Sequence, residues 1–261
     1  MNNEPSLFEQ VGAVARRSAV AALRQRALLI FPMVFPLILF AINGSALSSA
    51  TKIPNFPTHN YRDFLIAMPF VQGAMFVSIS AGTSLARDIE TGFLNRLALT
   101  PLRTEALLIG QLGGAFVLAC VQSVVYLLVG LATGVGFASG FGGVLVMIAL
   151  SLAISFGFAT LGGLLALRLG SGEAIQGVFP LLFVTLFLSS SSLPRNLIKT
   201  TWFRDVATYN PVSYLLEGLR SLVITGWDGR ALALAFGFAL LLAVVALGLS
   251  GPAMRSRLAR A

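Results

Sequence analysis

Long runs without charged residues constrain the fold of this chain more than any other feature. A helix that crosses roughly 30 Å of lipid hydrocarbon needs about 20 such residues. Runs free of Arg, Lys, Asp and Glu cover residues 27–51, 64–86, 106–167, 174–194 and 231–254. Only 11% of the 261 residues are charged and the mean hydropathy is +0.86, whereas a soluble domain has about 25% charged residues. The sequence therefore predicts an all-α integral membrane protein.

The third run is too long for one membrane span, and glycines mark where it divides. Residues 130–143 contain six glycines, a density that breaks helices and favours a turn. Dividing this run gives six transmembrane helices, predicted at residues 27–47, 64–86, 107–129, 144–167, 174–194 and 231–252. Because the number is even, both termini are expected on the same side of the membrane.

The orientation follows from the distribution of basic residues. Eleven Arg and Lys residues fall on the side of the termini and seven on the other side. Cytoplasmic loops carry the excess of positive charge, so a multi-pass protein of the plasma membrane with both termini in the cytoplasm is predicted. The formal charge of +8 is then explained by topology and contact with anionic lipids. No soluble domain remains that could bind nucleic acid.

Residues 6–26 have the pattern of an amphipathic helix lying on the membrane. Ser6 and Glu9 have the spacing of a capping box. One stripe of the helix is apolar or small and the opposite side is mostly basic, the pattern of an interfacial helix that meets lipid headgroups. The apolar stripe comprises Leu7, Val11, Val14, Ser18, Ala21 and Ala22, and Glu9, Arg16, Arg17 and Arg24 lie opposite. A loosely helical soluble tail is the alternative. Further along, the adjacent Gly113 and Gly114 indicate a close helix contact.

The connection before the last span, residues 196–225, contains two helix-like pieces too short to cross a membrane. Asn210 and Pro211 separate them and form a helix-start signal. Pieces of this length are typical of re-entrant or interfacial helices. Glu217 and Arg220 lie three residues apart, so we expect them to pair on one face.

Sequence motifs for catalysis are missing from the chain. It has no G-x-x-x-x-G-K-S/T loop for ATP, one histidine (His59) and one cysteine (Cys120), so the expectation is that it binds no cofactor or metal and is not an enzyme by itself. Charged residues inside the spans would mark an ion or proton pathway, and essentially none occur. A self-sufficient secondary transporter or channel is therefore disfavoured but stays the alternative function.

Residues 87–101 form a short amphipathic segment between two spans. On a helical wheel Ala86, Ile89, Phe93 and Leu97 share one side, and Arg87, Asp88, Glu90, Thr91 and Asn95 lie on the other. Such a cytoplasmic helix either lies on lipid or inserts into a groove of a partner protein. A helix that only faces lipid would carry mainly Lys and Arg on its polar side, so the two acids favour a protein partner.

Two motifs in this chain resemble those of type-2 ABC transporter permeases, in particular the drug-resistance exporters. The run R-D-I-E-T-G-F-L-N-R-L-A-L-T-P-L-R, residues 87–103, resembles the segment after the second span in that family. The run N-P-V-S-Y-L-L-E-G-L-R, residues 210–220, resembles its segment before the last span. Together with the six-span plan the resemblance covers essentially the whole chain. Asn95 departs from the family, in which many members have an acid there, so no ionic contact is assigned to it.

The resemblance implies the transmembrane permease subunit of an exporter, paired with a second permease chain as a homodimer or heterodimer. A separate cytoplasmic ABC ATPase would bind ATP and Mg and supply the energy. The coupling helix that docks on this ATPase would comprise residues 87–101, with Asp88, Glu90, Thr91, Gly92, Phe93, Arg96, Leu97 and Pro101 as its site residues. The re-entrant segment over the exit would use Asn210, Pro211, Glu217 and Arg220. The G-F-L-x-R-L form leans toward a hydrophobic drug-like or lipid substrate.

Overall fold

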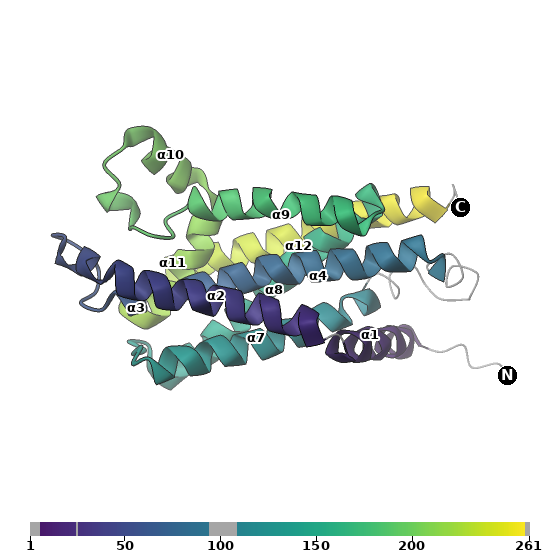
Figure 1. The fold of residues 1–261 in the computed structure, drawn as a ribbon, viewed down its shortest axis with the longest axis horizontal. Coiled ribbons are helices and arrows are strands. Elements are labelled where there is room, and N and C mark those ends of the chain that lie inside the picture. The colour runs from purple at the N-terminus through teal and green to yellow at the C-terminus, as the bar shows by residue number, and fades with distance from the viewer. Residues whose placement is uncertain (1–5, 25, 94–108, 259–261) are drawn as a thin grey trace.

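In the computed structural model the chain forms a bundle of long, roughly parallel and antiparallel helices (Figure 1). The structure describes residues 6–24, 26–93 and 109–258. The helices are α1 (Leu7–Arg24), α2 (Arg26–Ala46), α3 (Tyr61–Leu65), α4 (Ala67–Glu90), α7 (Gly113–Ala132), α8 (Gly140–Leu169), α9 (Gly172–Phe187), α10 (Thr201–Tyr209), α11 (Pro211–Ile224) and α12 (Gly229–Leu258), with short 3₁₀ turns η1 (Ser48–Lys52) and η2 (Arg195–Leu197). These described ranges contain no β-strand.

Among the described residues, four helical segments are long and apolar enough to cross a membrane: Tyr61–Glu90, Ile109–Ala132, Gly140–Leu169 and Gly229–Arg257. Two further apolar helices, Ile30–Ala46 and Gly172–Phe187, are shorter. The expectation of an all-α, multi-pass membrane protein is confirmed at this level. The fifth predicted span, residues 174–194, differs from α9, which ends at Phe187. A charge-free run measures only the distance to the next charged residue, here Arg195, and residues 188–194 within it are not helical.

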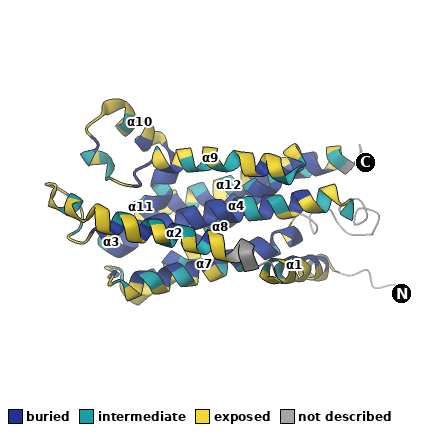
Figure 2. Ribbon diagram, in the orientation of Figure 1, coloured by how far each residue is buried: buried dark blue, intermediate teal, exposed yellow. Residues whose placement is uncertain are grey.

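Helix α4 is the centre of the bundle and packs against α2, α7, α8 and α9. Residues 67–78 of α4 are all buried, whereas large parts of α2 and α9 present exposed side chains (Figure 2). Many side chains of α12 are exposed as well. The exposed residues of these outer helices are mostly large and apolar, such as Leu181, Leu240 and Val244. A bundle with a buried central helix and an apolar exterior suits a hydrocarbon environment.

The two ends of the bundle differ in what they carry. Helix α1 and the C-terminal part of α12 lie at one end, which we call the α1 end (Figure 1). Helices α3, α10 and α11 lie at the other, the α11 end, where α10 projects beyond α9. Between α7 and α8 the glycine-rich stretch forms the turn at this end, with positive φ at Gly134 and Gly140.

Proline in α2 shows how the bundle satisfies a backbone group in an apolar interior. Pro36 has no N–H, so the carbonyl of Pro32, one turn earlier, loses its helical donor. The hydroxyl of Tyr126 on α7 donates to this carbonyl at 2.9 Å. The carbonyl that Pro36 leaves without a helical donor therefore joins α2 to α7.

Helix α1 begins with the predicted capping box: the Ser6 N–H donates to the Glu9 carboxylate at 2.7 Å, and the Glu9 N–H donates to Ser6 Oγ at 3.3 Å. The helix then packs against the start of α7. A Cβ on Gly114 would lie 2.7 Å from the carbonyl oxygen of Ser18, so glycine is required there. The Ser18 hydroxyl bridges the Gln111 carbonyl at 2.9 Å and the Gly114 N–H at 3.1 Å. Part of the predicted apolar stripe of α1 thus packs against protein.

Candidate functional site

The end of α4 carries the first residues of the predicted coupling helix. Helix α4 continues through Asp88 to Glu90, and Gly92 follows in the left-handed conformation with φ 67°. Glycine in this position ends a helix without steric cost. The single helix predicted from residue 87 onward is therefore corrected: residues 87–90 are the last turn of α4. Arg96, Leu97 and Pro101 lie outside the described residues.

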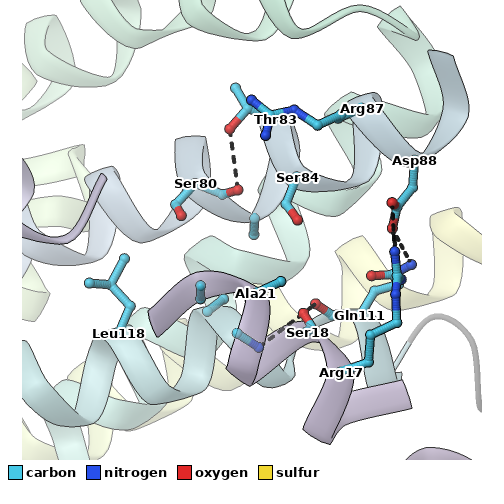
Figure 3. A pocket seen from close by; sticks show the side chains of 14 residues that line it. Arg17, Ser18, Ala21, Ser80, Thr83, Ser84, Arg87, Asp88, Gln111 and Leu118 are labelled. Atoms are coloured by element: carbon cyan, nitrogen blue, oxygen red, sulfur yellow. Dashed lines mark hydrogen bonds and ion pairs between the residues drawn. The ribbon is translucent and has the colours of Figure 1, made fainter. Parts of the chain in front are cut away.

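Asp88 joins three helices at the α1 end (Figure 3). Arg17 on α1 donates to both of its carboxylate oxygens, at 3.2 and 3.3 Å. The side-chain amide of Gln111, just before α7, donates to it at 2.8 Å. The acid that the sequence assigned to a partner protein thus already holds α1 and the start of α7 against α4.

Phe93 takes part in the same cluster. The guanidinium carbon of Arg17 lies 3.8 Å from the centre of the Phe93 ring, a distance at which the ring face attracts the cation. The Phe93 side chain is half-buried. Arg17 therefore contacts both the acidic and the aromatic residue of the predicted docking segment.

Glu90 connects α4 to α9. Its carboxylate accepts a hydrogen bond from the N–H of Gly172 at 3.0 Å. Gly172 is the first residue of α9, where the N–H groups have no partner within the helix and a negative charge is favourable. Thr91 turns back on its own helix, and its hydroxyl donates to the Arg87 carbonyl at 2.8 Å.

Arg17, Gln111 and Gly172 were not selected from the sequence as site residues. Arg17 was noted only as part of the basic side of α1, and the spacing of the other two from residue 88 carries no local signal. The α1 end therefore gathers α1, α7 and α9 around the last turn of α4 through contacts that only the fold creates.

At the α11 end, Asn210 and Pro211 begin α11 as predicted. The Asn210 side chain accepts a hydrogen bond from the Val212 N–H at 2.9 Å, and Pro211 occupies the first helical turn. The Asn210 amide also donates to the carbonyl of Thr185 on α9 at 2.6 Å. This residue caps one helix and fastens it to another.

The predicted pair of Glu217 with Arg220 is wrong. Glu217 instead forms an ion pair with Arg195 of η2, whose Nε donates to its carboxylate at 2.6 Å and whose Nη2 donates to the second oxygen. Arg195 also donates to the Thr208 carbonyl at 3.2 Å. Partial burial lowers the pKa of Arg195, but the hydrogen bonds and charge of Glu217 outweigh it and raise the pKa above its ordinary value. Arg195 therefore stays charged, and its contacts with Glu217 and Thr208 fasten η2 and α10 to α11.

Arg220 is buried, and no carboxylate of the described residues contacts it directly. Its guanidinium donates to three backbone carbonyls: Phe64 at 2.8 Å, Ser190 at 2.6 Å and Ser191 at 2.6 Å. The guanidinium carbon also lies 3.6 Å from the centre of the Phe64 ring. The carbonyls of Ser190 and Ser191 follow α9 and that of Phe64 belongs to α3, so Arg220 joins three segments of the α11 end. The three-residue spacing of Glu217 and Arg220 could not predict this arrangement, because the carbonyl partners of Arg220 are remote in sequence.

Among the described residues, no group of three or more His, Cys, Asp or Glu side chains could hold a metal ion. The contacts described at the two ends of the bundle connect helices to one another.

Comparison with known proteins places the chain in a family. The ABC-2 type transporter family matches residues 9–224, which covers most of the chain, and the protein belongs to this family of ABC transporter permeases. The expected resemblance is confirmed.

Individual proteins that are similar to this chain are also named as permeases. The chain is 27% identical over 202 residues to the daunorubicin resistance ABC transporter permease protein DrrB1 of Streptomyces coeruleorubidus, covering 75% of this chain and 67% of the relative. It is 26% identical over 217 residues to the putative transport permease ycf38 of Cyanophora paradoxa, covering 82% and 74%. With the probable multidrug ABC transporter permease YbhR of Escherichia coli (strain K12) the identity is 29% over 168 residues, which covers 62% of this chain and 44% of YbhR.

Proposed function

We propose that this protein is the transmembrane permease subunit of an ATP-driven ABC exporter that moves a hydrophobic, drug-like or lipid substrate out of the cell. A separate cytoplasmic ABC ATPase binds ATP and Mg, and a second permease chain completes the transporter. The observation that carries this proposal is the match of residues 9–224 to the ABC-2 type transporter family. The names of DrrB1 and of the doxorubicin resistance permease DrrC of Mycobacterium tuberculosis support drug export.

The proposed topology has six spans, made by α2, α4, α7, α8, α9 and α12, with both termini in the cytoplasm. The position of α1 and of the C-terminal part of α12 at the same end of the bundle supports an even number of spans. The α1 end then faces the cytoplasm, and η2, α10 and α11 form the re-entrant segment at the outer end. Single cysteines placed in a Cys120→Ser background test this: position 16 should react with an impermeant reagent only after permeabilisation, and position 204 before it.

A cluster of phenylalanines between α2, α4 and α9 supports a hydrophobic and partly aromatic substrate. Phe76 lies 4.8 Å from Phe179 and 5.8 Å from Phe35 between ring centres, and Phe179 lies 4.6 Å from Phe183. At the edge of the cluster, Phe31 is exposed. Rings that are partly open can stack on an aromatic ligand, which makes daunorubicin the first compound to test.

The proposed partnership is tested by purifying the tagged permease after coexpression with candidate ABC ATPases. We expect an ATPase to copurify and its hydrolysis of ATP to change when daunorubicin is added to proteoliposomes. The permease alone should hydrolyse no ATP. If no ATPase copurifies and purified permease alone transports the drug down an ion gradient, the chain is a secondary transporter and the proposal fails.

Phe93 offers a sharper test of docking. A docked helix gains much of its binding energy from one or two large side chains, and truncating such an anchor costs about 2 kcal/mol or more. Phe93→Ala should therefore reduce the retained ATPase at least tenfold, whereas Thr91→Ala should retain it. Because Phe93 also contacts Arg17, Arg17→Gln is the matched control for that contact. Equal retention by Phe93→Ala and parent would show that the ring does not anchor the ATPase, as would be the case if it rested among lipid headgroups.

A further inference from the structure

Two adjoining cavities open beside α1. The first, of about 170 Å³, lies between α1, α4 and α7, and the second, of about 580 Å³, runs along the outer side of α1. Arg17 and Ala21 line both spaces, and the second is an open surface lined by α1 residues alone, so the two adjoin at these residues. We call the combined space the α1 cleft.

The α1 cleft is strongly basic. Arg16, Arg17 and Arg24 line its outer part, and Arg87 lines its inner part. Asp88 is the one acid among the described lining residues, and its charge is opposed by Arg17. The three guanidinium groups of α1 against the one carboxylate of Asp88 leave an excess of positive charge, which attracts an anion to the cleft.

Hydroxyl groups cover the α4 side of the cleft. Ser80 and Ser84 lie on the side of α4 that faces α1 (Figure 3), and Thr83 adjoins them. Ser84 is exposed although it belongs to a helix that is apolar enough to cross a membrane. Arginine and serine donors together are the groups that bind the oxygens of a phosphate.

An apolar surface borders the basic one. Val20 lines the outer cavity and is 39% exposed, and Leu23, beside Arg24, is 50% exposed. A ligand that fills the cleft therefore meets arginines and hydroxyls at one part and exposed aliphatic side chains at another. An anionic phospholipid combines these two chemistries, and basic pockets between transmembrane helices on the cytoplasmic side suit such headgroups.

We propose that the α1 cleft binds the phosphate headgroup of an anionic phospholipid from the inner leaflet. The choice of leaflet rests on the proposed function and its topology, whereas the binding itself does not. Bound lipid bridges the outer part of α1 to α4 and so holds α1 in place beside the last turn of α4.

The test uses the full-length permease in detergent and native mass spectrometry to count bound lipid. Phosphatidylglycerol and phosphatidylcholine with the same acyl chains are offered at equal concentration. We expect phosphatidylglycerol to be retained preferentially, and Arg16→Gln/Arg24→Gln to lower its affinity by about fivefold for each arginine. Both arginines are exposed on α1. Arg255→Gln, an exposed arginine of α12 outside the cleft, is the matched control and should bind like the parent.

Two further measurements identify the part of the lipid that is recognised. Ser84→Leu fills the inner part of the cleft without a change of charge and should also lower phosphatidylglycerol retention. Inorganic phosphate at millimolar concentration should displace little lipid if headgroup and acyl chains bind together. Full displacement by phosphate would overturn the lipid assignment in favour of a soluble phosphate compound.

Unchanged phosphatidylglycerol preference in Arg16→Gln/Arg24→Gln, with circular dichroism equal to the parent, would overturn the proposal. So would an equal loss in Arg255→Gln, because the preference would then reflect total charge. These outcomes need no ATPase, so they are separate from failure of the proposed function, which appears as missing ATPase copurification.

Discussion

The two ends of the helix bundle are held by charges in different surroundings. At the α1 end, the Arg17–Asp88 pair keeps 45% of the arginine and 14% of the aspartate side chain exposed. At the α11 end, Arg220 is buried and its donors are satisfied by three carbonyls. Water and salt weaken an exposed pair to about 1 kcal/mol or less, whereas separating a buried cation from its acceptors leaves polar groups without partners. We therefore expect the α11 end to be rigid and the α1 end to be adjustable.

This difference agrees with the proposed function. A docking end that must respond to an ATPase needs contacts that can be exchanged at low cost, and Arg17, Asp88 and Glu90 provide such contacts. The opposite end must keep its short helices α10 and α11 in place without the support of a long span. The hydrogen bonds of Arg195 and Arg220 provide this support.

The largest effect is expected at Arg220. Replacing it in Arg220→Met removes the donors to Phe64, Ser190 and Ser191, and each buried carbonyl left without a donor costs about 1 kcal/mol or more. The variant should lose about 3 kcal/mol of unfolding free energy, measured by denaturation in mixed detergent micelles. Arg230→Met, at an exposed position near the same end, should unfold like the parent. If both variants match the parent, the buried arginine does not stabilise the α11 end.

A smaller effect is expected for the pair of Arg195 and Glu217. The contact is bidentate but partly exposed, with 20% and 35% of the two side chains accessible, so its coupling free energy should be about 1 kcal/mol. A double-mutant cycle with Arg195→Gln and Glu217→Gln measures it through thermal unfolding. The charge swap Arg195→Glu/Glu217→Arg should recover part of the loss caused by either reversal alone. A second double-mutant cycle on Glu217 and Arg220 that gives the larger coupling would contradict the observed pairing.

The bond from Glu90 to the start of α9 should have a local effect. Glu90→Ala removes the acceptor of the Gly172 N–H and a negative charge at a helix N-terminus, worth about 0.5 kcal/mol. Hydrogen exchange of the segment that begins at Gly172 should become faster by roughly twofold. Glu90→Gln keeps an acceptor oxygen and should preserve more of the protection. Equal exchange in parent and Glu90→Ala would show that the contact does not order α9.

The smallest effect is expected for Arg17 and Asp88. Their coupling in a double-mutant cycle with Arg17→Gln and Asp88→Asn should be about 0.3 kcal/mol at low salt. It should fall further in 1 M salt, where charges are screened over about 3 Å. The Arg195–Glu217 coupling, measured under the same two conditions, should change less. If the Arg17–Asp88 coupling is the larger and insensitive to salt, the proposed contrast between the two ends is wrong.

Features that depend on near neighbours in the chain could be predicted from the sequence. The capping box of Ser6 and Glu9 and the helix start at Asn210 and Pro211 are formed as expected, because a cap needs only residues within one turn. The membrane class follows from runs without charge, since no pairing of remote residues is needed to keep an apolar helix in lipid. The family resemblance likewise rests on two continuous motifs.

Contacts between remote residues could not be predicted in this way. Spacing alone made Arg220 the natural partner of Glu217, but the fold brings Arg195 to Glu217 and the carbonyls of Phe64, Ser190 and Ser191 to Arg220. The helical-wheel argument predicted a new helix from residue 87 and did not account for Gly92. This glycine has a positive φ and follows the end of α4.

The sequence by itself determined that this protein is helical and lies in a membrane, where two of its helices begin, and to which family it belongs. Each of these properties is encoded within a single segment by hydrophobicity and local backbone preference. Only the tertiary structure decided which charges meet. A charged side chain in an apolar bundle has many acceptors of similar chemistry within its reach, and the packing of α3, α4, α9 and α11 selects among them. The same packing places α1 beside α4 and α7, which brings Arg17 to Asp88 and opens the basic cleft between them.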